Sequence, residues 1–184
     1  MMQHYKSILR GLNIKKCYFP TGINGAGDVC VEIKIANISG LTVWSFGSRI
    51  GVYNKAFALI CSQNKNLRFY YNNKYADYKY SLGVQYTLKI DKGVFYVNGN
   101  IIGSVNQASF DNGLEIYLCG LNNGGTASAE GVIGFYYAKI WKNDVLVRDY
   151  IPSLVGGVYG LYDNVSDSFG PFIVKNDGSI SPIL

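Results

Sequence analysis

Short segments in which apolar residues fall at every second position constrain this fold more than any other feature of the sequence. The stretch 28–36, DVCVEIKIA, carries β-branched residues at alternate positions, namely Val29, Val31, Ile33 and Ile35. Because successive side chains of a β-strand point to opposite faces, this pattern predicts a strand with one buried face.

Similar segments recur along the whole chain. They cover residues 41–47, 56–62, 67–71, 85–91, 94–99, 114–120 and 131–142, with Gly, Asn and Asp clusters between them. This spacing predicts about ten to thirteen short strands and is typical of a β-sandwich. Residues 1–13 are the best helix candidate, but they break at Gly11 and lack an amphipathic stripe, so no helix longer than a turn or two is expected.

Three tight turns follow from local chemistry. Asn98 and Gly99 can both adopt the positive φ of a two-residue hairpin turn, which predicts a hairpin over 94–105. Turns are also expected at 91–93 and at 143–144.

Length and composition favour one domain. The 184 residues are 48% hydrophobic, with 22 Gly and only 4 Pro, which suits one chain of strands and tight turns with a sizeable core. We expect a single domain over 1–184, with residues 1–12 as a flexible or docking arm.

Charge and hydropathy exclude two classes of partner. The net charge is +5, but the basic residues are scattered and their longest run is Lys15 and Lys16, so no nucleic-acid-binding stripe is expected. No window approaches the roughly 20 apolar residues of a membrane span, and the N-terminus lacks the apolar stretch of a secretory signal. The sequence therefore predicts neither nucleic-acid binding nor membrane insertion.

The four cysteines are widely spaced, and no pair has metal-ligand spacing. Three of them, Cys30, Cys61 and Cys119, lie inside apolar strand-like runs, and the fourth is Cys17. Buried free thiols are expected at all four positions rather than disulfides or a metal site.

Four segments carry a resemblance to a known family. They are YFPTGI (18–23), YTLKIDKGVFYVNGNIIG (86–103), KIWKNDVLVRDYIP (139–152) and GLYDNVSDSF (160–169). Together they resemble laminin G-like, concanavalin A-like domains that are abundant in gut bacteria and their phages. The resemblance implies an all-β, two-sheet antiparallel jelly-roll sandwich. One departure is the Ser-Asp-Ser at 166–168, where the family has Asn-Gly, which leaves the form of that turn open.

The closing segment also allows expectations about single residues. Arg148 and Asp149 are neighbours on a strand and should point to opposite faces, so no direct ion pair is expected between them. Pro152 is expected to end that strand, because it has no N–H for the ladder. Trp44 and Trp141 are expected to be core anchors.

The residues needed for hydrolysis are missing or badly placed. Glucanases of the fold that the resemblance implies use acidic residues two positions apart on one strand, and Glu32, Glu115 and Glu130 have no acidic residue at that spacing. The only histidine is His4, near the terminus. We therefore expect no enzyme activity, no catalytic residues and no cofactor.

Aromatic and amide side chains gather in the segment 69–80, FYYNNKYADYKY, and amides recur at 122–123. Aromatic faces with amide and carboxylate groups are typical of sugar sites. The predicted ligand-binding residues are Tyr71, Asn73, Tyr75, Asp77, Tyr78, Asn122 and Asn123. Two alternatives stay open, in which the tyrosines simply pack or form a protein interface.

A metal site is not expected. Asp163 and Asp167 could offer oxygens to calcium, but two carboxylates in a turn are commoner as turn formers.

These expectations lead to two functions. The first is a non-catalytic attachment or display protein, namely a phage virion component such as a capsid decoration, head fibre or tail-associated module. Its partners would be other virion proteins, its own copies and surface glycans, and it would be assembled in a bacterial cytoplasm and displayed on the virion surface. The second is a soluble, cytoplasmically made lectin-like module that binds a polysaccharide. The virion assignment follows from the habitat of the family that the sequence resembles.

Overall fold

The computed structural model describes residues 6–51, 54–105 and 109–184, and every regular element in these ranges is a β-strand. The strands are Lys6–Ile8 (β1), Leu12–Ala26 (β2), Val29–Asn37 (β3), Val43–Ile50 (β4), Asn54–Cys61 (β5), Asn66–Asn72 (β6), Lys74–Lys79 (β7), Tyr86–Asp91 (β8), Val94–Val97 (β9), Asn100–Ser104 (β10), Asp111–Leu118 (β11), Leu121–Asn123 (β12), Thr126–Ser128 (β13), Val132–Lys142 (β14), Val145–Val155 (β15), Val158–Asp163 (β16), Ser168–Pro171 (β17) and Ile173–Pro182 (β18).

Eighteen strands in the described ranges exceed the ten to thirteen expected from the sequence. The difference comes largely from short or exposed strands such as β12, β13, β17 and β18. The side chains of β18 are largely exposed, so it carries no apolar alternation and is held by its ladder with β2. Strand prediction from periodicity misses such elements because it needs a buried face.

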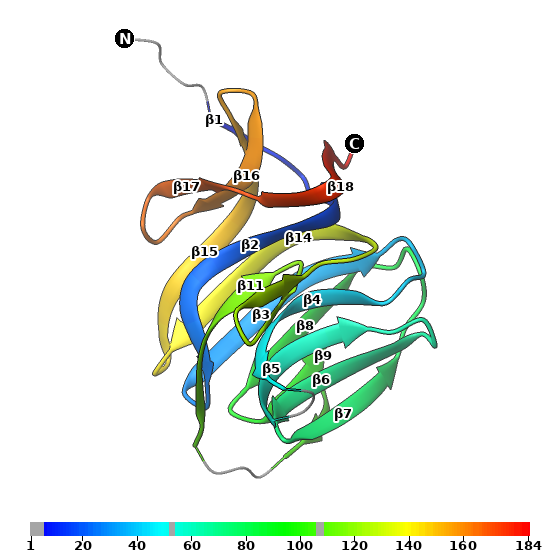
Figure 1. Ribbon diagram of the computed structural model, residues 1–184, viewed down its shortest axis with the longest axis vertical. Coiled ribbons are helices and arrows are strands. Elements are labelled where there is room, and N and C mark those ends of the chain that lie inside the picture. The colour runs from blue at the N-terminus through cyan, green and yellow to red at the C-terminus, as the bar shows by residue number, and fades with distance from the viewer. Residues whose placement is uncertain (1–5, 52–53, 106–108) are drawn as a thin grey trace.

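The strands form two stacked sheets (Figure 1). Sheet A has the order β10–β9–β8–β3–β14, and the far edge of β14 pairs with both β2 and β15. From there β15 leads to β16 and β17, and the first half of β2 pairs with β18. Sheet B has the order β2–β11–β4–β5–β6–β7. The expected all-β antiparallel sandwich is therefore confirmed, apart from one short parallel pairing of β12 with β4.

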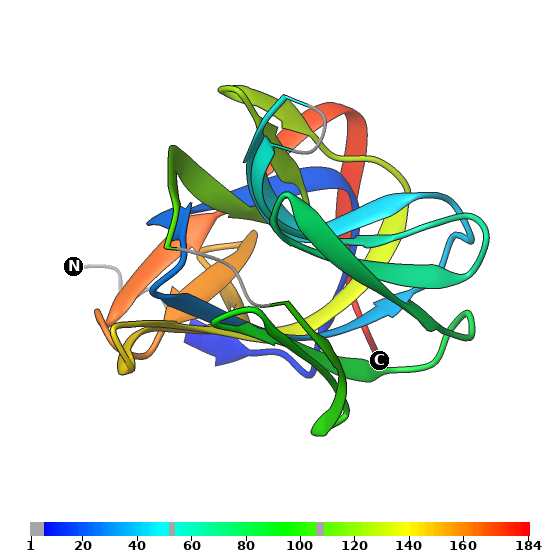
Figure 2. The same ribbon diagram turned by 90° about the horizontal axis from the view of Figure 1, so that it is seen from below.

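One long strand joins the two sheets. The first part of β2 pairs with β14 and β18 in sheet A, and its second part pairs with β11 in sheet B. The described start of the chain also belongs to the fold, because β1 pairs with β15 and Leu12 is fully buried. Strands β1, β16, β17 and β18 gather at one end of the molecule, while β5, β6 and β7 lie at the other (Figures 1 and 2).

The core lies between the inner faces of the sheets. The alternation in β3 is confirmed, since Val29, Val31 and Ile33 are fully buried and Ile35 is 1% exposed. Fully buried phenylalanines face one another across the layers, for example Phe69 of sheet B against Phe95 of sheet A, at 5.5 Å between ring centroids. Each such side chain contributes about 1.5–3 kcal/mol by burial.

The predicted turns are confirmed. Asn98 and Gly99 have φ of 50° and 80° and join β9 to β10. Lys92 and Gly93 join β8 to β9 with φ of 47° and 81°, and Asn143 and Asp144 join β14 to β15.

Segments that carry the family resemblance meet at one place, which we name the closing node: Thr21, Arg148, Tyr150 and Asp163. The backbone carbonyl of Thr21 accepts hydrogen bonds from Arg148 Nε at 3.2 Å and from the Tyr150 hydroxyl at 3.1 Å. Arg148 Nε also lies 3.7 Å from the buried carboxylate of Asp163. As expected, the ion-pair partner of Arg148 is not its neighbour Asp149.

Pro152 does not end its strand, contrary to expectation. It lies inside β15 and pairs with Leu161 of β16. Its carbonyl accepts a hydrogen bond from Leu9 N at 2.9 Å, on the edge opposite β16. The N–H and C=O of a strand residue point to the same side, so the N–H that Pro152 lacks would also face the edge away from β16. On that edge Pro152 lies between the ladder with β14 and the ladder with β1. The ladder with β16 therefore loses no hydrogen bond to the proline.

The two tryptophans are not core anchors, contrary to expectation. Trp44 and Trp141 are only half-buried, and both lie on outer faces of the sandwich. Trp44 packs beside Tyr70 on sheet B, and Trp141 lies near Lys89 on sheet A. The apolar side chains before and after Trp44, such as Val43 and Phe46, take the inward positions instead.

All four cysteines are buried and free, as predicted. Burial raises the pKa of the Cys30 and Cys61 thiols to about 12 and raises those of Cys17 and Cys119 as well. Because the thiolate is the reactive form, these thiols should be inert in the folded protein.

We expect the native protein to react with a thiol reagent such as DTNB at pH 8 only as fast as it unfolds. In guanidinium chloride all four thiols should react at once, which serves as the control. A rapid reaction of one thiol per chain in native buffer would contradict the buried placement.

Candidate ligand-binding face

The outer face of sheet B carries a cluster of aromatic and charged side chains, which we name the tyrosine face: Trp44, Arg49, Arg68, Tyr70, Asn73, Tyr75 and Asp77. Strand alternation places it there. In β6, Leu67 and Phe69 point into the core, so Arg68 and Tyr70 point outward. The register of β7 against β6 then sets Tyr75 opposite Tyr70 and Asp77 opposite Arg68.

An ion pair fixes the centre of this face. Arg68 Nε lies 2.7 Å from one carboxylate oxygen of Asp77, and Arg68 Nη2 lies 2.8 Å from the other. The same guanidinium lies over the ring of Tyr75, 4.2 Å from its centroid. The hydrogen bond to Asp77 raises the pKa of Arg68, which keeps it charged. A two-point pair held against an aromatic ring has a defined orientation, unlike most surface ion pairs.

A surface cavity of about 310 Å³ opens beside this pair. Its lining residues are Arg68, Tyr70, Asn73 and Tyr75. Tyr75 is 54% exposed and offers a free ring surface, whereas Tyr70 is only 7% exposed and supports it from below. The cavity thus combines an aromatic wall with the N–H donors of Arg68 and Asn73 and the carbonyl acceptor of the Asn73 amide.

The aromatic row continues toward the β12–β13 hairpin. Ring centroids are 6.1 Å apart between Tyr75 and Tyr70 and 6.3 Å apart between Tyr70 and Trp44. Arg49 lies over Trp44 at 5.1 Å and donates to Asn123 Oδ1 at 3.2 Å. This row connects the segment 69–80 with Asn123, which lies far from it in the sequence.

The structure separates the predicted ligand-binding residues into two groups. Asn73, Tyr75 and Asp77 lie together on the tyrosine face, and Asn123 joins it through Arg49. Tyr71, Tyr78 and Asn122 do not contribute to this face.

Tyr71 is 3% exposed, belongs to the core and donates to Gly27 O at 3.0 Å. Tyr78 pairs with Leu67, so it lies on the opposite face of the hairpin from Tyr75. Asn122 is 4% exposed, and its side chain holds Glu115 O and Gly125 N, which is a structural role in the β12–β13 turn. The prediction overlooked strand alternation within 69–80, which sends consecutive tyrosines to opposite faces.

The sequence pattern did not identify Arg49 and Arg68 as site residues, and it predicted that Trp44 lies in the core. The pairing of Arg68 with Asp77 had a usable signal: a two-residue turn at Asn72 and Asn73 fixes the hairpin register that sets them opposite each other. No local signal pointed to Arg49, because its contact with Asn123 spans 74 residues.

The three glutamates considered for hydrolysis occupy separate places. Glu32 accepts a hydrogen bond from the Tyr137 hydroxyl at 2.9 Å, Glu115 accepts one from the Gly22 N–H, and Glu130 is exposed in the loop before β14. His4 lies outside the described residues. Within the described ranges, no three Asp, Glu, Cys or His side chains are grouped so as to hold a metal ion.

Asp163 and Asp167 act in the turn between β16 and β17. Asp163 accepts hydrogen bonds from Val165 N and Ser166 Oγ, and Asp167 accepts one from the Tyr162 hydroxyl. Asp167 has φ of 52°, so the Ser-Asp-Ser segment forms this turn without glycine.

Among the residues that the structure describes, there is no helix of the length and apolarity that a membrane crossing requires.

Comparison with known proteins places the chain near no family. No protein-family model matches the sequence, and no curated protein matches it. One similar solved structure is a mutant of Trypanosoma rangeli sialidase displaying trans-sialidase activity, with 13% sequence identity and a TM-score of 0.46. The match covers 74% of this chain but only 27% of the sialidase chain, so the chain spans about a quarter of that protein's length.

Proposed function

We propose that this chain is a non-catalytic attachment module that binds a glycan on its tyrosine face. The observation that carries the proposal is the Arg68–Asp77 pair, held against the exposed ring of Tyr75 beside a cavity of about 310 Å³.

The chemistry of this cavity matches that of a sugar. A pyranose ring has an apolar face of C–H groups that packs on an aromatic ring, and Tyr75 offers such a surface. Its hydroxyls both donate and accept hydrogen bonds. The carbonyl oxygen of the Asn73 amide can accept from them, while the N–H groups of that amide and of the Arg68 guanidinium can donate.

Preorganisation favours binding at this place. The two hydrogen bonds between Arg68 and Asp77 fix both side chains before a ligand arrives, so less side-chain entropy is lost on binding. Hydrogen bonds to charged groups contribute about 1.5–3 kcal/mol each, more than neutral ones. One or two such bonds, together with ring stacking, would give a weak affinity at each site. An attachment protein compensates for this when several copies of the site bind at once.

Binding to an array of bacterial and host oligosaccharides tests the proposal, and two variants locate the site. We expect Tyr75→Ala to weaken binding to the best array ligand by at least tenfold, because the stacking surface is lost. Tyr78→Ala is the matched control, since Tyr78 is another exposed tyrosine of the same strand, at 37%, and lies on the opposite face. It should bind as the wild type does. Equal loss in both variants, or none in Tyr75→Ala, would exclude the tyrosine face.

Display on a phage particle is the further part of this proposal, with virion proteins or copies of this chain as partners. It is supported by the resemblance of the closing segments to domains of gut bacteria and their phages. A soluble lectin-like module is the alternative. The mass in solution separates them, because fibres and decorations are symmetric assemblies whereas a free lectin module can act as a monomer.

A further inference from the structure

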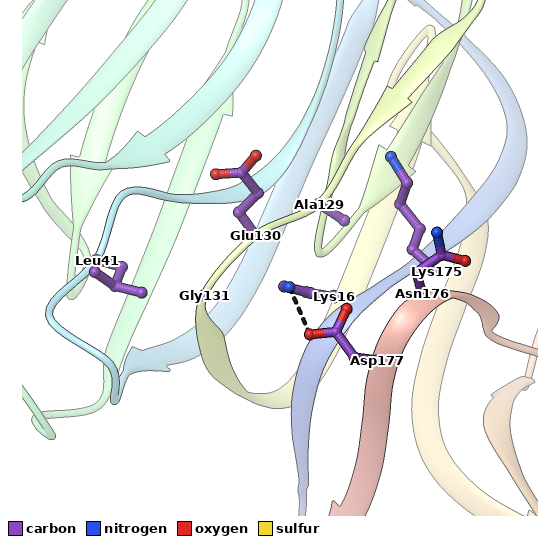
Figure 3. Close-up of a pocket in the computed structure, with 8 residues that line it drawn as sticks. All are labelled: Lys16, Leu41, Ala129, Glu130, Gly131, Lys175, Asn176 and Asp177. Atoms are coloured by element: carbon purple, nitrogen blue, oxygen red, sulfur yellow. Dashed lines mark hydrogen bonds and ion pairs between the residues drawn. The ribbon is translucent and has the colours of Figure 1, made fainter.

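A cavity of about 540 Å³ lies where β18 bulges away from β2 (Figure 3). Residues 175–178 of β18 bulge out opposite Lys16, because the ladder between the two strands shifts register there. Lys16 Nζ is paired with Asp177 Oδ2 at 2.8 Å, and Lys175 Nζ donates to Ala127 O at 2.6 Å. Figure 3 shows the two ammonium groups pointing apart, and the described residues that line this cavity include no aromatic ring. Its polar groups therefore do not converge on one ligand.

The outer face of sheet A carries a smaller cavity, of about 250 Å³, which has an aromatic ring among its walls. We name it the sheet A pocket, and it is lined by Glu32, Thr87, Lys89, Tyr96 and Gly99. Strand alternation turns these side chains outward, because neighbours such as Leu88 and Phe95 are fully buried in the core. The ladder pairs Glu32 with Lys89 and Lys89 with Tyr96, so these three side chains lie in one row across β3, β8 and β9.

A cation held between two rings orders one side of this pocket. Lys89 Nζ lies 5.4 Å from the ring centroid of Tyr96 and 5.7 Å from that of Trp141. It is also paired with Asp91 Oδ2 at 3.0 Å. Asp91 follows Lys89 by two residues on the same face of β8, whereas Thr87 precedes it by two, so this pair draws the ammonium away from Thr87.

The polar groups on the other side belong to Glu32 and Thr87. Glu32 Oε1 accepts a hydrogen bond from the Tyr137 hydroxyl at 2.9 Å, which orients the carboxylate while leaving it further lone pairs. The Thr87 hydroxyl can both donate and accept. At the rim, a Cβ on Gly99 would meet nothing within 4 Å, so the hairpin turn leaves the pocket open.

The charges around the sheet A pocket are balanced. Lys89 is paired with Asp91, and the ladder sets Glu32 between Lys139 and Lys89. An acid group on a ligand would meet the Glu32 carboxylate, and like charges repel. The pocket therefore favours an uncharged ligand that has hydroxyls and an apolar face.

We infer that the sheet A pocket binds an uncharged sugar unit, which stacks on the ring of Tyr96 and directs hydroxyls toward Glu32 and Thr87. A volume of about 250 Å³ is below the usual range of about 300–1,000 Å³ for drug-sized ligands, as suits a single ring. The pocket shares no residue with the tyrosine face and lies on the opposite outer face of the sandwich. A chain with both sites holds two glycan chains at once. That consequence rests on the proposed function, whereas the sheet A pocket does not.

Amide NMR titration of the full chain tests this inference, with the methyl glycosides of glucose, galactose, mannose and N-acetylglucosamine as probes. We expect at least one of these sugars to shift the amides of β3, β8 and β9 around the pocket, and sodium glucuronate to bind there more weakly. Tyr96→Ala should weaken the binding at least tenfold, because the stacking surface is lost. Tyr96→Phe keeps the ring and should bind as the wild type does. Tyr75→Ala, on the other face, is the control and should leave this binding unchanged.

Three results would overturn the inference. The first is an absence of shifts at the sheet A pocket with every one of these sugars. The second is equal loss of binding in Tyr96→Phe and Tyr96→Ala, which would exclude stacking on the ring. The third is tighter binding of glucuronate than of the uncharged sugars. Shifts confined to the tyrosine face would support the proposed function and overturn this inference, whereas shifts confined to the sheet A pocket would do the reverse.

Discussion

Replacing Asp163 with alanine is expected to lower the free energy of unfolding by about 3–5 kcal/mol, the typical cost of removing one partner of a buried ion pair. Asp163 is 2% exposed. Its carboxylate accepts hydrogen bonds from Asp149 N at 2.9 Å, Val165 N at 3.1 Å and Ser166 Oγ at 2.6 Å, and it lies 3.7 Å from Arg148 Nε. Alanine would leave the three hydrogen-bond donors without their acceptor and the Arg148 charge without its carboxylate partner inside the closing node.

Urea denaturation of Asp163→Ala against Asp144→Asn measures this effect. Asp144 also forms an ion pair, with Lys92 at 2.7 Å, but its side chain is 76% exposed. Exposed pairs contribute about 0–1 kcal/mol, so Asp144→Asn should unfold close to the wild-type midpoint. A change of less than 1 kcal/mol in Asp163→Ala would show that the node does not hold the closing strands.

The same carboxylate should make stability depend on pH in acid. Burial alone would raise the pKa of Asp163, but the hydrogen bonds from Asp149, Ser166 and Val165 and the charge of Arg148 outweigh it and lower the pKa. A lowered folded-state pKa contributes stability that is present above the unfolded-state pKa and is lost as pH falls through the folded value. Melting temperatures measured from pH 6 down to pH 2 should therefore fall less steeply in Asp163→Asn than in the wild type.

Replacing Gly160 with alanine is expected to destabilise the protein by about 3 kcal/mol or more, at the upper end of what overpacking costs. A Cβ at this position would lie 2.2 Å from Gly170 O and 2.6 Å from a ring carbon of Phe169. Gly160 pairs with Ser153 of β15 on one side and with Pro171 of β17 on the other, so β16 cannot shift without breaking one ladder. This close approach explains why the GLYD segment begins with glycine.

Gly157→Ala separates the clash from ordinary glycine strain. Gly157 lies three residues earlier with φ of 82°, and a Cβ there would meet nothing within 4 Å. That variant should cost about 1 kcal/mol, from the left-handed backbone alone. Equal destabilisation of the two variants in chemical denaturation would mean that the clash at Gly160 is relieved by movement of β17.

Much of the candidate site was within reach of sequence reasoning. Asn73, Tyr75 and Asp77 lie in one hairpin, where a two-residue turn and a period of two fix neighbours locally. Tyr71 and Tyr78 were grouped with these residues by composition alone, without the strand alternation that sends consecutive tyrosines to opposite faces.

The sequence by itself determined the strands with a buried face, the turns and the burial of the cysteines. The β3 alternation and the Asn98–Gly99 turn are examples, and each depends on residues within a few positions of one another. The periodicity of a strand and the positive φ of turn residues depend only on residues that are close in the sequence.

Only the tertiary structure decided which distant residues meet. The pairing of Arg148 with Asp163, the outward position of Trp44, the contact of Arg49 with Asn123 and the bulge opposite Lys16 all depend on the register between strands that are not joined by a tight turn. The register of such strands is set by side-chain packing and ladder hydrogen bonds summed over both sheets. It therefore cannot be predicted from any short segment of the sequence.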